Sequence, residues 1–232
     1  MSRWDFYKQN LQKYINKNSS VLVIGGSEDE YKLYKNLGYE NFKISNLESE
    51  NNKFSFEILN IDATNIPYED NYFDYVITHA CLHHMRKPHI ALIEMYRVSK
   101  IGTLIIEGND SFIMRLSSSL GFSEKFETSS VDKINKKGGV EESGIPNYIY
   151  RWTEREIYKT LSSFEPEFKH KILFNYSNDL SNECVQDNSN GKILKIILKI
   201  ILKLFFLFFT KQQNLLSIFI DKKNNSERIF KI

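Results

Sequence analysis

Three histidines stand close together near the middle of this chain. His79 ends an apolar run that reads as a strand, and His83 and His84 follow within five residues. A neutral imidazole near pH 7 can take a proton from a hydroxyl or an amine as that group attacks an electrophile. His83 and His84 are therefore candidate general bases. The alternative is that they cap a helix or fill the edge of a sheet, a more common use of any single histidine.

Polar groups that can bind a ligand stand at the ends of neighbouring predicted strands. Asn46, Asp62 and Glu107 each follow or close one of these strands. Ligands of doubly wound α/β folds bind outside the carboxyl ends of the strands, so these side chains should meet at one edge. There Asp62 can accept a hydrogen bond from an adenine amino group, and the Ala63 N–H can donate to a ring nitrogen. The alternative for Asp62 is that it only caps a turn.

The elements that must position these groups begin with the stretch Val21–Glu30. Its four apolar residues predict a buried strand, Gly25 and Gly26 predict a tight turn, and Ser27 with Glu30 predicts a capping box that opens a helix. Such a helix N-terminus usually attracts phosphate, but here three consecutive acids occupy its first turn. A nucleoside with a cationic centre and no phosphate fits better, and S-adenosylmethionine is such a molecule.

Five short segments between Asn60 and Asp110 then occur in a fixed order. They are Asp62-Ala63-Thr64-Asn65-Ile66-Pro67, Phe73-Asp74, Leu82-His83-His84, Glu94-Met95-Tyr96-Arg97-Val98, and Gly102 before the strand Thr103–Glu107. In this order the chain resembles the class I S-adenosylmethionine-dependent methyltransferases, particularly the methyltransferase type 11 group that includes the ubiquinone- and menaquinone-biosynthesis enzymes. The resemblance covers about Val21 to Asp110.

The resemblance implies a doubly wound α/β fold with a mainly parallel, seven-stranded sheet, and S-adenosylmethionine as the cofactor. The cofactor-binding residues would be Gly25, Gly26, Ser27, Asn46, Asp62, Ala63 and His79. Two features depart from the family: Ser27 and Asp29 stand where later glycines of the first motif are usual, and Asn46 replaces the carboxylate that holds the ribose. Losing that charge would weaken binding roughly tenfold. A methyltransferase-like binding or scaffold protein with a decayed cofactor site is therefore the first rival.

Alternating strand and helix patterns predict a single α/β domain over residues 1–232, with a core at 19–110, an insertion and acceptor-side segment at 111–165, and a C-terminal part at 166–232. Strands are expected at 21–24, 41–45, 54–59, 73–78, 103–107, 168–176 and 215–221. Helices are expected at 3–17, 28–37, 88–99, 112–120 and 153–163, and polar connections at 48–53, 123–147 and 177–190.

A cluster of aromatic and basic residues follows the polar insertion. Tyr150, Arg151 and Trp152 stand just before a helix that Thr153 and Glu156 are expected to cap. Clusters of this kind stack on sugars or bind anionic groups, which favours an acceptor site here, with Glu107 nearby. The alternatives are that the aromatic residues anchor the insertion to the core and that Glu107 is a solvated loop carboxylate.

An unusual helix is predicted near the C-terminus, over residues 192–209. Lys192, Lys195, Lys199 and Lys203 form one narrow polar stripe on an otherwise apolar helix. The helix is too short and too charged to be a good membrane span. Two interpretations stay open: the helix packs into the domain or against a second copy in a homodimer, or it lies on an anionic membrane surface.

Composition limits the remaining function classes. The chain has 232 residues and a formal net charge of +2, with acids and bases mixed throughout, which gives no electrostatic footprint for nucleic acid. Two distant cysteines predict a reducing cytoplasm and no metal site, and the charged N-terminus does not resemble a secretion signal. We expect methyl transfer to a small-molecule, glycan or lipid-linked acceptor by a cytoplasmic protein that is at most peripheral at the inner membrane face. A nicotinamide-dependent oxidoreductase is the second rival, and the acidic first turn and Asp62 oppose it.

Overall fold

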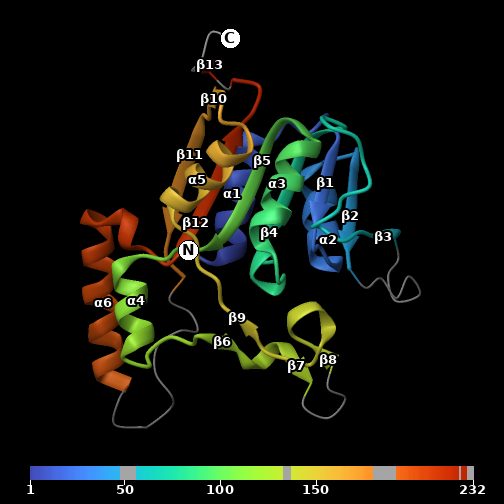
Figure 1. Cartoon of the computed structure of the whole chain (residues 1–232). Helices are drawn as coiled ribbons and strands as arrows, with labels where there is room; N and C mark the ends of the chain where they lie inside the picture. The colour runs from blue at the N-terminus through green and yellow to red at the C-terminus, as the bar shows by residue number, and fades with distance from the viewer. Residues whose placement is uncertain (48–55, 133–136, 180–191, 225, 229–232) are drawn as a thin grey trace.

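Seven strands form the central sheet of the computed structural model (Figure 1), which describes residues 1–47, 56–132, 137–179, 192–224 and 226–228. Their order is β11-β12-β5-β4-β1-β2-β3, and β12 is the one strand of this sheet that runs antiparallel to its neighbours. The strands are β1 (Val21–Ile24), β2 (Phe42–Asn46), β3 (Ile58–Asn60), β4 (Phe73–His79), β5 (Ser99–Gly108), β11 (Ile172–Ser177) and β12 (Leu215–Asp221). The predicted mainly parallel, doubly wound sheet is confirmed.

Helices cover both faces of this sheet. On one face α1 (Arg3–Tyr14) and α2 (Glu28–Leu37) share a buried cluster with alternate residues of the central strands. On the other face α3 (Pro88–Val98) and α5 (Glu154–Phe164) pack into a second cluster. Both clusters are apolar and almost fully buried, so the sheet is the middle layer of three.

The capping residues expected at Ser27, Gly38 and Thr153 are confirmed by the geometry of the helix ends. Ser27 and Thr153 both form complete capping boxes, the first with Glu30 and the second with Glu156. Gly38 ends α2 in the left-handed conformation, with φ of 79°. A third capping box, Ser2 with an acid three residues later, opens α1 and was not expected. The first helix also ends earlier than predicted, at Tyr14.

Two strands differ from the sequence-based expectation. The third is β3 at Ile58–Asn60, whereas residues 54–55 of the expected 54–59 lie outside the described chain. The expected strand 168–176 is two strands, β10 (Phe168–Lys169) and β11, because His170 turns inward between them and is buried. β10 pairs with β13 (Ser226–Arg228), while β11 joins the main sheet. The predicted connections at 48–53 and, from 180 on, at 177–190 also lie outside the described residues.

The polar insertion after α4 (Phe112–Ser119) folds as two short antiparallel ribbons. One pairs β6 (Phe126–Glu127) with β9 (Asn147–Tyr148), and the other pairs β7 (Val131–Asp132) with β8 (Lys137–Gly138). In Figure 1 the insertion lies below the carboxyl ends of β1 and β4. It is therefore placed to form one wall of a site at that edge.

The C-terminal apolar helix is α6 (Lys192–Phe208), and it lies with α4 beside the main body, away from α2 and α3 (Figure 1). The turn after α6 is fixed to the start of α4, because Ser111 donates to the Gln212 carbonyl and the Ile113 N–H donates to the Gln212 side chain. Among the helices that the structure describes, none combines the length and apolar character that a membrane crossing requires.

Arg97 holds the loop that follows β3. Its guanidinium donates to the carbonyls of Ile66 and Tyr68 at 3.0 and 2.8 Å and forms an ion pair with Glu94 at 2.8 Å. Glu94 in turn accepts the Ile66 N–H at 2.9 Å. The Glu-x-x-Arg segment of α3 therefore positions the loop that carries Asp62.

Replacing Arg97 with methionine should lower the free energy of unfolding by about 2–3 kcal/mol, because two loop carbonyls and Glu94 lose a charged partner. Arg115→Met is the matched control, since Arg115 is more exposed (57% against 22%) and, among the described residues, pairs with Asp110 alone. The Arg115→Met variant should lose less than about 1 kcal/mol of unfolding free energy. Urea unfolding measures both, and equal losses would contradict this assignment.

Candidate functional site

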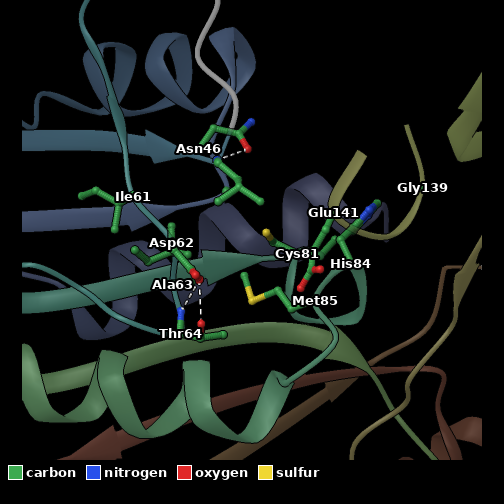
Figure 2. A pocket seen from close by; sticks show the side chains of 14 residues that line it. Asn46, Ile61, Asp62, Ala63, Thr64, Cys81, His84, Met85, Gly139 and Glu141 are labelled. Carbon is green, nitrogen blue, oxygen red and sulfur yellow. Dashed lines mark hydrogen bonds between the residues drawn. The ribbon is translucent and has the colours of Figure 1, made fainter. Parts of the chain in front are cut away.

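A cavity of about 500 Å³ opens at the carboxyl ends of β1 to β4 (Figure 2). The loops after these strands supply most of its walls, and the insertion supplies the rest. The lining residues are Ile24, Gly25, Asn46, Leu47, Ile61, Asp62, Ala63, Thr64, Ala80, Cys81, His84, Met85, Gly139 and Glu141. This volume and mixture of apolar and polar walls are those of a small-ligand site.

The floor of the cavity requires glycine at position 25. Gly25 has φ of 69°, and a Cβ there would lie 1.9 Å from the Cys81 sulfur. The turn after β1 and the loop after β4 are therefore in direct contact. Ala80 holds φ of 51°, an unfavourable conformation for a residue with a Cβ, at the point where β4 ends. Burial raises the pKa of the Cys81 thiol to about 12, so this thiol stays protonated.

Asp62 and Asn46 both reach the cavity, as the sequence predicts. Asp62 Oδ1 accepts two hydrogen bonds from Thr64, one from its N–H and one from its hydroxyl, both at 2.8 Å. These bonds fix the carboxylate while its second oxygen has no hydrogen bond from the described residues. Asn46 accepts the Leu47 N–H at 2.8 Å, which keeps its amide at the cavity wall (Figure 2). Ala63 is buried directly beneath.

The structure does not bring His79, Gly26 and Ser27, which the sequence predicts as cofactor contacts, to the lining of this cavity. Successive strand residues point to opposite faces, and His79 points toward α1, where it stacks on Tyr7 at 4.5 Å. Its Nδ1 lies 3.3 Å from Glu30, an acid of the first turn of α2. Gly26 packs against β2, and Ser27 uses its hydroxyl as the N-cap.

Glu107, His83 and Glu127 form a charged row beside the cavity. The buried Glu107 carboxylate accepts the Leu82 N–H at 2.7 Å and faces His83 Nδ1 at 3.0 Å. His83 Nε2 lies 3.6 Å from Glu127 on β6. Burial by itself lowers the pKa of His83, but the charges and hydrogen bonds of the two carboxylates overcome it and raise that pKa to about 9. His83 is therefore a cation at neutral pH.

His84 lies on the cavity side of the same row. Its Nε2 is 3.5 Å from Glu127, and its Nδ1 is 2.6 Å from the Asn147 amide nitrogen. Asn147 also donates to Glu127 at 3.2 Å. Ligand atoms of His83, His84 and Glu127 lie within 4.8 Å of one another, a spacing that could also hold a metal ion. The Nε2 proton of His83 and a hydrogen of the Asn147 amide already compensate Glu127, and they lower the pKa of its carboxyl to about 2.

A second, smaller cavity of about 170 Å³ adjoins the first, and Ala80 lines both. Tyr150, Arg151 and Glu107, which the sequence analysis assigns to an acceptor site, all line it. Trp152 does not: it is fully buried in the core beside Tyr150, so it anchors the segment after the insertion. Sequence reasoning missed the other polar walls, which come from α1 and the insertion and include Arg3, Glu124 and Glu127.

Comparisons with known proteins agree with this fold. Residues 36–106 match the family described as methyltransferase domain. Among solved structures, the chain is similar to an S-adenosylmethionine-dependent methyltransferase from Archaeoglobus fulgidus (15% identity, 95% of each chain covered, TM-score 0.56). It is also similar to the PH0226 protein from Pyrococcus horikoshii (14% identity, 94% and 89% covered, TM-score 0.54) and to YcgJ from Bacillus subtilis (12%, 95% and 98%, 0.52). At these identities the structures show the fold, and no curated protein matches the chain.

Replacing His83 with glutamine should cost stability in a pH-dependent way. The pKa of His83 is about 9 in the folded chain against an ordinary 6.5, so its proton stabilises the fold fully below pH 6.5. That contribution is lost as the pH rises toward about 9. The difference in unfolding free energy between the original chain and His83→Gln should therefore shrink over this range, as measured by urea unfolding.

Ser111→Ala is the control for this experiment, because it removes two hydrogen bonds at the start of α4 that involve no titrating group. Its effect on the unfolding free energy should stay the same across the range. A His83→Gln effect that is equally constant would show that His83 does not carry the proton assigned to it.

Proposed function

We propose that this chain, a class I methyltransferase whose cofactor is S-adenosylmethionine, methylates a hydroxyl or an amine of a small-molecule, glycan or lipid-linked acceptor. The observation that carries the proposal is the pair of cavities that share Ala80, with His84 lining the larger and His83 the smaller. The larger cavity suits the cofactor and the smaller one the acceptor. We propose that the protein is cytoplasmic.

The larger cavity fits the nucleoside part of the cofactor. The second oxygen of Asp62 has no hydrogen bond from the described residues, and it can accept one from an adenine amino group. The Ala63 N–H can serve a ring nitrogen, and the Asn46 amide can bond a ribose hydroxyl. Ile24 and Ile61 supply apolar walls. Gly25 keeps the left-handed turn at the floor of the cavity without a Cβ, which favours a working cofactor site over a decayed one.

When bound, the cofactor supplies an electrophilic methyl group on a sulfonium. The chain's own residues then have to orient the acceptor and remove its proton. His83 cannot act as the base at neutral pH, because Glu107 and Glu127 hold it as a cation. His83 therefore serves as a fixed positive charge at the border of the two cavities.

We assign the base to His84. Its Nδ1 accepts a hydrogen bond from Asn147, so the neutral ring carries its proton on Nε2 and a lone pair on Nδ1. Exchange of this hydrogen bond for an acceptor hydroxyl would let Nδ1 take the proton. Glu127, 3.5 Å from Nε2, would then stabilise the resulting cation.

The smaller cavity suits a polar acceptor. Tyr150 offers an aromatic face, and Arg151 lines the same wall while its guanidinium donates to the Glu124 carbonyl. Such a pair can stack on a sugar or hold an anionic group. Met114 of α4 adds an apolar contact to the wall of this cavity. This combination favours a glycan that carries an apolar or anionic part.

His84→Gln should lower kcat about 100-fold while S-adenosylmethionine binding, measured by calorimetry, stays unchanged. The rate is followed as release of adenosylhomocysteine, with a lipid-linked glycan extract as acceptor. His89→Gln is the control, since His89 packs against Trp152 and lines neither cavity. Normal turnover by His84→Gln would contradict the base assignment, and no turnover by the original chain would count against this acceptor class.

A further inference from the structure

We infer that α4 and α6 together form a docking surface for an anionic membrane. On α6 the side chains of Ile200, Ile201, Leu204, Leu207 and Phe208 are exposed, and the last two are 72% and 84% accessible. On α4 and the turn after it, exposed apolar residues recur every four positions at Phe112, Leu116 and Leu120. We call this the α4–α6 surface. It is far more apolar than an ordinary solvent-facing helix pair.

The two helices act as one surface because they are joined at one end. Gln212, in the turn after α6, receives hydrogen bonds from Ser111 and from the Ile113 N–H at the start of α4. Phe206 of α6 is buried, so this side of the helix faces the protein. The exposed apolar residues of α6 named above face outward. The exposed positions of α6 are spaced by three and four residues, which places them on a single face.

The positive charge of these two segments favours an anionic membrane as the binding partner of the α4–α6 surface. Residues 112–122 and 192–213 contain no aspartate or glutamate, whereas the second segment contains five lysines. One of the five, Lys211, is paired with Glu154 at 2.8 Å, which leaves four for an anionic partner. Lys203 is exposed next to the apolar face. A second copy of this chain would set lysines against lysines with no acid of either segment to compensate them. Anionic lipid headgroups compensate them directly, while leucine and phenylalanine enter the acyl boundary.

The surface also adjoins the proposed acceptor site. Met114, on the inner side of α4, lines the smaller cavity, while Phe112 and Leu116 of the same helix face outward. A docked membrane would therefore lie one helix away from that cavity. This link to a lipid-linked acceptor rests on the proposed function, but membrane docking itself does not.

Flotation of the full chain with vesicles tests the inference. Vesicles of phosphatidylcholine with phosphatidylglycerol should carry the protein upward, and pure phosphatidylcholine vesicles should carry at least tenfold less. Binding to the anionic vesicles should also fall as salt is added, because the lysines act through screened charge. Calorimetric binding of S-adenosylmethionine, measured in parallel without vesicles, reports the methyltransferase site separately.

Two variants locate the surface. Leu204→Glu with Leu207→Glu should lower the vesicle partition coefficient at least a hundredfold, since each substitution removes an inserted side chain. Lys203→Glu keeps the apolar face and should lower it several-fold. Ile90→Glu on α3 is the matched control, an exposed apolar residue outside this surface, and should float as the original chain does.

The outcomes are distinct. Flotation with anionic vesicles alone, lost in the double variant but kept in Ile90→Glu, would support the surface. Equal flotation with neutral vesicles would overturn the role of charge. No flotation, together with a dimer in light scattering that the double variant abolishes, would make a second copy the occupant and overturn the inference. Retained cofactor binding in every variant shows that the fold is intact.

Discussion

The buried carboxylate of Glu107 constrains everything around the two cavities. A charge that lies in the interior at the end of β5 must be compensated, or the fold pays several kcal/mol for it. Compensation comes from the Leu82 N–H and from His83, both in the loop after β4. His83 then faces Glu127 of the insertion, which the Asn147 amide also holds. The interactions that compensate Glu107 therefore hold the loop after β4, the insertion and the border between the cavities in place.

The parallel order of the strands explains why chemistry gathers at this edge. β1, β2, β3 and β4 all end on the same side, so Gly25, Asn46, Asp62 and Ala80 meet although they are far apart in the chain. Position along a strand is not sufficient, however. His79 ends the same strand that leads to Ala80, but the alternation of side chains turns it toward α1 and Tyr7. At the end of β4, a shift of one residue along the chain therefore decides whether a side chain lies in the cavity or in the core.

The sequence predicts the fold, and it also indicates several residues that line the cavities, for a physical reason. Strand periodicity, capping boxes and the turn at Gly25 are local, and they gave the sheet, the helix ends and the positions of Asp62 and Asn46. The positions of Trp152 and Glu127 in the structure depend on long-range packing instead. Trp152 looked like an acceptor residue from its neighbours but fills the core, and Glu127 sits in a polar stretch with no motif. The pKa of His83 likewise depends on two distant acids.

Binding of S-adenosylmethionine to the larger cavity is the central claim, and titration calorimetry of the Asp62→Asn variant tests it most directly. The asparagine keeps an oxygen for the Thr64 bonds but replaces the other oxygen with a donor, so the loop stays and the adenine contact is lost. The original chain should bind, Asp62→Asn should bind about tenfold more weakly, and Asp29→Asn, an exposed acid on α2, should bind normally. Failure of the original chain to bind at millimolar cofactor, or equal binding by Asp62→Asn, would contradict this account.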